Sequence, residues 1–63
     1  MNFIEFLRSE ANRLNDTAHA TENGNMWVGD PLTPSKSERM EAADRIRQAA
    51  KLILEIAERN ERE

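Results

Sequence analysis

The stretch SKSERMEAADRIRQAAKLILEIAERNE, residues 35–61, decides the fold. It contains no glycine or proline, and residues of high helix propensity dominate it. Ser35 and Glu38 have the spacing of a capping box, and Thr33 followed by Pro34 offers an overlapping start. Opposite charges four residues apart support the helix further. We therefore predict one long helix over residues 35–61.

A second, shorter helix is predicted over residues 3–19. Asn2 is a favourable N-cap, and Glu5 follows it at capping-box spacing. Ile4 and Phe6 widen the apolar stripe of this helix at its start only. The stripe itself recurs every three or four positions and consists of Phe3, Leu7, Ala11, Leu14 and Ala18.

Residues 20–34 are predicted to form the connecting loop. Asn23-Gly24-Asn25 is a turn signal, because glycine adopts positive φ at little cost. Met26 and Trp27 are apolar residues in a polar segment, and we expect them to fold back on the helices near the start of the long helix. Trp27 then anchors the loop, and the alternative is a hot spot for a binding partner.

The length of the second helix predicts an elongated molecule. At about 1.5 Å per residue it is about 42 Å long, whereas a compact domain of 63 residues has a diameter of about 27 Å. The long helix cannot fit inside such a globule. We therefore predict an all-α fold, a two-helix antiparallel hairpin that forms a single domain over residues 1–63.

Two offset apolar stripes run along the second helix. The first consists of Ala42, Ile46, Ala49, Ile53 and Ile56, with Ala43, Ala50 and Ala57 beside it. The second consists of Met40, Ala43, Ala50, Leu54 and Ala57. Both include part of residues 52–57, which are apolar nearly all round. We expect the first helix to cover the first stripe, with Phe3, Phe6 and Leu7 beside Ile53 and Ile56.

One covering helix leaves Leu52 or Leu54 exposed, and an exposed patch of this kind indicates an interface. The chain has no cysteine and one histidine, so neither a disulfide nor a structural zinc site adds stability. We therefore predict self-association into a helical bundle, as a homodimer or a larger closed ring. The predicted oligomer interface consists of Ile46, Ala50, Leu52, Ile53, Leu54, Ile56 and Ala57.

The composition favours a protein that is not an enzyme and that uses no cofactor or metal. Cysteine and tyrosine are absent, and His19, the only imidazole, lies where a histidine commonly caps a helix end. A net charge of −3 makes nucleic acid an unfavourable partner. No apolar run is long enough to span a membrane, so we expect a cytoplasmic protein without a membrane partner.

Our leading hypothesis is a small interaction protein, an inhibitor or modulator that binds another protein as a homo-oligomer. Short acidic helical chains of this kind are frequent among phage and mobile-element accessory factors, an analogy of size and class only. The alternative is an oligomer that holds a small anionic ligand, such as a nucleotide, at its subunit interfaces. Residues considered for partner or ligand binding are Trp27, Met26, Arg39, Arg47 and Lys51.

Overall fold

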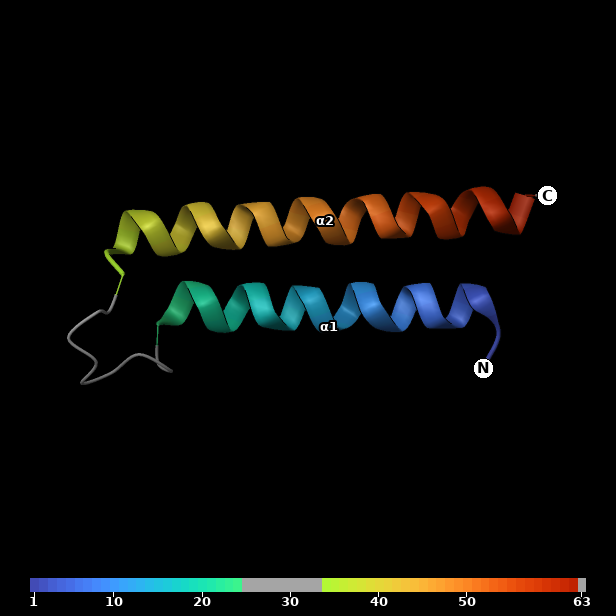
Figure 1. Cartoon of the computed structure of the whole chain (residues 1–63), viewed down its shortest axis with the longest axis horizontal. Helices are drawn as coiled ribbons and strands as arrows, with labels where there is room; N and C mark the ends of the chain where they lie inside the picture. Colours follow the sequence, from blue (N-terminus) through green and yellow to red (C-terminus); the bar gives the residue numbers. More distant parts are fainter. Residues whose placement is uncertain (25–33, 63) are drawn as a thin grey trace.

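Two antiparallel helices make up the fold, with both termini at the same end of the hairpin (Figure 1). The computed structural model describes residues 1–24 and 34–62. Helix α1 spans Phe3–Asn23 and helix α2 spans Lys36–Arg62. The hairpin measures 49 × 21 × 13 Å, and its radius of gyration of 14.4 Å exceeds the value of about 11 Å expected for a compact chain of this length. The predicted elongated, all-α hairpin is confirmed.

The start of each helix uses the cap that its sequence predicts. The side-chain oxygen of Asn2 accepts a hydrogen bond from the backbone N–H of Glu5 at 2.8 Å. At α2 the capping box is complete, since Glu38 N–H donates to Ser35 Oγ at 3.2 Å and Ser35 N–H donates to Glu38 Oε1 at 3.1 Å. These bonds satisfy N–H groups that have no partner within the helix.

Helix α1 continues four residues beyond the predicted range of 3–19 and ends at Asn23. Gly24 follows with φ of 67°, and its N–H donates to Ala20 O at 3.2 Å. A left-handed residue after the last turn is the usual helix stop, and glycine adopts it without strain. The Asn-Gly signal therefore marks the helix end itself rather than a turn inside a loop. Residues 25–33, with the predicted roles of Met26 and Trp27, lie outside the described residues.

The helices meet along a seam with heptad spacing in which alanines are interspersed with larger apolar side chains. On α1 the residues at core positions a and d are Ile4, Leu7, Ala11, Leu14, Ala18 and Thr21. On α2 they are Ala43, Ile46, Ala50, Ile53 and Ala57. All five alanines in these two sets are at most 1% exposed, whereas the largest buried side chain, Leu7, keeps 8% of its surface exposed. We call this contact the alanine seam.

The face of α2 that packs against α1 differs from the predicted one. Ala42, Ala49 and Ile56 were expected to face α1, but all three are exposed. The predicted and the observed seams share Ile46 and Ile53 and have the same heptad spacing, so they differ only by a rotation of α2 about its axis. The observed rotation places alanines at the contact, where a small side chain lets the two backbones approach closely.

The contact at the open end of the hairpin also differs from the prediction. Phe3 and Phe6 were expected beside Ile53 and Ile56, but both phenylalanines are exposed, and the half-buried Ile4 takes the core position. The first turn of α1 lies near Asn60, about two turns further along α2 than Ile53. The length of α1 explains the shift. Because the last turn of α1 lies beside Arg39, near the start of α2, the first turn of α1 lies further toward the C-terminus of α2 than predicted.

The close contact at the alanine seam predicts that a larger side chain at its centre is destabilising. Ala50→Leu adds three carbon atoms where the exposed fraction is 1%, and overpacking of this kind typically costs about 1–3 kcal/mol. We expect that loss in the free energy of unfolding, measured by urea denaturation at a fixed protein concentration. Gln48→Leu adds a leucine at an exposed position two residues away and should change stability by less than about 0.5 kcal/mol. Equal effects of the two variants would contradict the seam.

The helix stop predicts that Gly24→Ala is destabilising. An alanine must adopt the left-handed φ of 67°, and its Cβ would lie 2.7 Å from Nε and 2.9 Å from Cδ of Arg39. We expect a loss of about 1–2 kcal/mol, the usual cost of that conformation for a residue with a Cβ. Chemical denaturation measures the free energy of unfolding, with Ser9→Ala as the control at an exposed position. A Gly24→Ala protein as stable as this control would contradict the assignment of Gly24 as the left-handed residue that ends α1.

Candidate interaction surface

Ion pairs between α1 and α2 line one broad face of the hairpin. Arg8 pairs with Glu61, and Arg47 Nη2 lies 2.7 Å from Glu22 Oε2. In each pair the two residue numbers add up to 69 (8 and 61, 22 and 47), so both pairs belong to a single antiparallel register. All four residues occupy heptad position e, which flanks the alanine seam on one side. We call this side the ion-paired face.

The pair of Glu22 and Arg47 is the best formed of these contacts. Arg47 donates through both terminal nitrogens, at 2.7 and 3.4 Å, in the two-pronged geometry that a guanidinium and a carboxylate prefer. Asp44 adds a weaker contact at 3.9 Å. The hydrogen bond from Arg47 lowers the pKa of the Glu22 carboxyl below its ordinary value of 4.5, and the same bond raises the pKa of Arg47. Arg47 is therefore occupied within its own chain.

Arg39 is occupied as well, at the connected end of the hairpin. It donates to Pro34 O at 2.8 Å and to Glu22 O at 3.5 Å. The last turn of α1 has no basic residue of its own, so Arg39 supplies the positive charge that favours a helix C-terminus. Arg39 thus joins the end of α1 to the segment that leads into α2.

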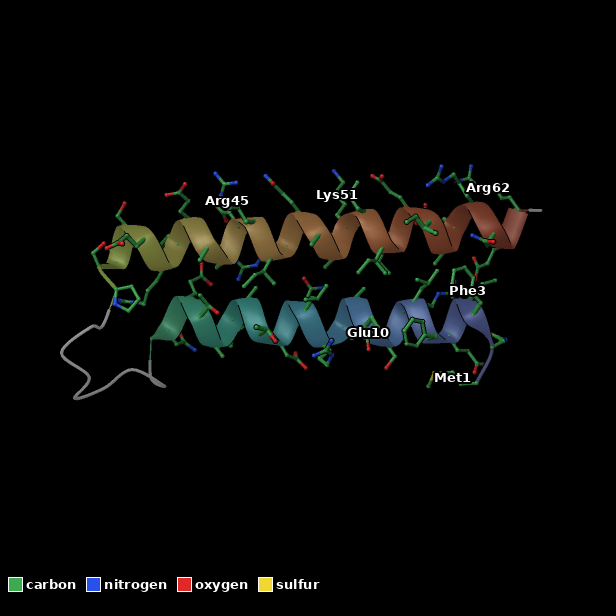
Figure 2. All side chains as sticks on the ribbon, in the orientation of Figure 1. Met1, Phe3, Glu10, Arg45, Lys51 and Arg62 are labelled. Atoms are coloured by element: carbon green, nitrogen blue, oxygen red, sulfur yellow. The ribbon has the colours of Figure 1, made fainter. Side chains whose placement is uncertain are left out.

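Lys51 projects from the outer edge of α2, away from α1, as do Arg45 and Arg62 (Figure 2). Arg45 reaches Glu41 at 3.4 Å along its own helix. The three basic residues considered for ligand binding therefore do not face a common ligand site, since Arg39 and Arg47 are both engaged with Glu22 and Lys51 points outward.

The opposite broad face carries large apolar side chains. In the heptad, positions g and c lie on the side of the alanine seam away from position e. On α1 these positions include Phe3 and Phe6, which are 56% and 49% exposed, and on α2 they include Leu52 and Ile56, which are 60% and 36% exposed. Phe3 lies at the end of the hairpin that holds both termini (Figure 2). We call this side the apolar face.

The predicted oligomer interface is distributed over three environments. Ala50 and Ala57 are buried in the alanine seam, where α1 covers them, and Ile46 and Ile53 are half-buried beside them. Leu54, 36% exposed, occupies position e and so lies on the ion-paired face. Only Leu52 and Ile56 of the predicted set lie on the apolar face.

Sequence reasoning assigned Phe3 and Phe6 to the contact within the hairpin and so missed them as surface residues. A signal for their position exists in the sequence. Ile4, Leu7, Ala11, Leu14 and Ala18 continue a 3-4-3-4 spacing without a break, and both phenylalanines lie outside it. Reading the heptad from Ile4 instead of Phe3 would have placed both aromatic rings beside the seam.

His19 is exposed on α1, and residues 1–24 and 34–62 contain no group of three potential metal ligands. Neither of the two described helices is long and apolar enough to cross a membrane. Comparisons with protein families, with characterised proteins and with solved structures find no match for this chain.

The ion pair at Glu22 predicts a pH-dependent contribution to stability. Because folding lowers the pKa of Glu22, the contribution is present above the ordinary value of 4.5 and is lost as the pH falls through the lower pKa of the folded state. Glu22→Gln should therefore unfold at lower urea concentration than the wild type at about pH 7, and the difference should shrink as the pH is lowered below 4.5. Glu55→Gln controls for the loss of one negative charge. A difference that persists unchanged in acid would contradict this role.

Proposed function

We propose that the chain is a non-enzymatic interaction protein that acts by protein–protein binding as a homo-oligomer, in the manner of an inhibitor or modulator. The observation that carries the proposal is the inverted distribution of its apolar residues. Alanines are the best-covered residues of the contact between the helices, and Leu7 is the one large apolar side chain among the described residues that is buried there. Other large apolar side chains lie outside the contact, and those of the described residues that are at least 36% exposed are Met1, Phe3, Phe6, Met40, Leu52, Leu54 and Ile56.

Such a surface is unusual for a chain that works alone. Scattered apolar residues are normal on a protein surface, but contiguous ones mark interaction sites. Here four of the exposed residues share one broad face, and within residues 1–24 and 34–62 Leu7 is the one large apolar side chain that is buried. A second protein surface that covers this face supplies the burial that the hairpin lacks.

The alternative function, binding of a small anion at a subunit interface, draws less support from the described residues. It requires Arg47 to face a ligand, but Arg47 is paired with Glu22 at 2.7 Å and lies near Asp44. An anion would have to displace two carboxylates from it. Arg39 is likewise engaged with backbone carbonyls. We therefore favour the apolar interaction.

The proposal predicts an assembly larger than the 7.3 kDa chain. Sedimentation velocity from micromolar to hundreds of micromolar protein should show association that persists from about 0.1 M to about 1 M salt, over which the Debye length falls from about 10 Å to about 3 Å. An apolar interface is insensitive to that change, whereas an anion-dependent or charge-driven one weakens. A monomer at every concentration, or association abolished by salt, would contradict the proposal.

A further inference from the structure

We infer that the apolar face is the docking surface for a second copy of this chain, and that two hairpins pack through it with their twofold axis parallel to the helices. The result is an up-down-up-down four-helix bundle. This inference rests on the proposed function and specifies which face and which arrangement the self-association uses. Three features of the described residues lead to it.

The first feature is the difference between the two broad faces. A helix that packs in a bundle is apolar at a, d and one flanking position, either e or g. On α2 the residues at g are Ala42, Ala49 and Ile56, all apolar. Position e instead holds two of the crossing ion-pair residues, Arg47 and Glu61. Burying the ion-paired face would remove these charges from water at a large desolvation cost. The apolar face also carries charged residues at g and c positions, among them Glu10, Arg13, Arg45 and Arg59, and within the described part of the chain none of these four forms an ion pair between the helices.

The second feature is the amount of surface that the hairpin leaves exposed. Its accessible area is 4843 Å², whereas a compact chain of 7.3 kDa exposes about 4,200 Å². The excess of about 650 Å² is close to the roughly 800 Å² per partner that a stable protein interface buries. The broad face has dimensions of 49 × 21 Å, which is large enough to provide that area.

The third feature is that the apolar face complements itself. A twofold axis parallel to the helices places α1 of one hairpin over α2 of the other, with both open ends together. Phe3 and Phe6 of one copy then meet Leu52 and Ile56 of the partner, and the symmetry repeats this contact. Toward the connected end, the small side chains of Ala42 and Ala49 allow close approach.

A twofold axis perpendicular to the helices gives a poorer match. It places the open end of one hairpin over the connected end of the other, because it reverses the helix direction. The phenylalanines would then lie over the polar half of the partner, which carries Arg13 and Thr17 on α1 and Arg45 on α2. Large apolar groups would remain in water, so the parallel axis is favoured.

The test compares two leucines on the same helix. Leu52→Asp places a charge on the apolar face and should weaken dimerisation at least about tenfold, because a buried unpaired charge is strongly unfavourable. Leu54→Asp places the same charge on the ion-paired face, which stays in water, and should leave the dimer within about twofold of the wild type. Sedimentation equilibrium gives both constants, and circular dichroism verifies that each variant remains helical.

A second measurement determines the relative orientation of the two hairpins without a substitution in the interface. Because the chain has no cysteine, Arg62→Cys introduces a single site for a spin label at an exposed position near the open end. The parallel axis predicts a distance between the two labels of about 30 Å or less, the width of a bundle with axes about 10 Å apart plus the label arms. A perpendicular axis predicts a distance near the 49 Å length of the hairpin.

The outcomes separate this inference from the proposed function. A dimer that survives Leu52→Asp but not Leu54→Asp, or labels that lie near 49 Å apart, would overturn the inferred face or arrangement and leave self-association intact. An assembly of more than two chains would also overturn it. A wild-type chain that is monomeric at every concentration would overturn both, and the apolar face would then belong to a different protein.

Discussion

Contact through alanine is the constraint on which the rest of the hairpin depends. A methyl group lets two helices approach closely and is fully covered when they do, as the exposed fractions of 0–1% at Ala11, Ala18, Ala43, Ala50 and Ala57 show. The apolar area that each alanine removes from water is small, and hydrophobic stabilisation is proportional to that area. A seam of this kind therefore provides a close and well-defined contact but little stabilisation per residue. Ile4, Leu14, Ile46 and Ile53 occupy seam positions and stay half-buried, whereas Phe3, Phe6, Leu52 and Ile56 lie beside the seam and are exposed.

The ion pairs fix the register of the two helices, which contacts between alanines do not. On α2 the seam repeats an alanine and an isoleucine in each heptad, so a shift of one heptad changes its packing little. Arg8 with Glu61 and Glu22 with Arg47 are two heptads apart on both helices, so a one-heptad shift would break both pairs. Exposed ion pairs contribute little to stability, but they discriminate between registers. Leu54 lies midway between these pairs along α2.

Much of the fold can be predicted from the sequence because its signals are local. The caps at Asn2 and Ser35 and the uninterrupted helix after residue 35 depend on neighbouring residues only, and the structure agrees with each. The Asn-Gly signal is local too, but it was predicted to form a turn inside the loop and instead ends α1. The seam could not be predicted by hydrophobicity, because two heptad stripes share Ile46 and Ile53. The stripe with Ile56 is the more apolar, yet the observed rotation brings Arg47 to the side where it meets Glu22. The surface prediction failed in the same way, since Phe3 was assigned to the core in place of Ile4.

The two ends of the hairpin are stabilised by different means. At the connected end, the hydrogen bonds of Arg39 to Pro34 and Glu22 hold the helices together, and chain connectivity keeps them close. Near the open end the helices are joined by the exposed ion pair of Arg8 with Glu61, which contributes little stability, and helix ends are where local unfolding begins. The large apolar residues of the open end, Phe3, Phe6 and Ile56, lie outside the seam. Covering these residues would restrain both helix ends at once, so association through the apolar face would stabilise the part of the hairpin that its own contacts secure least.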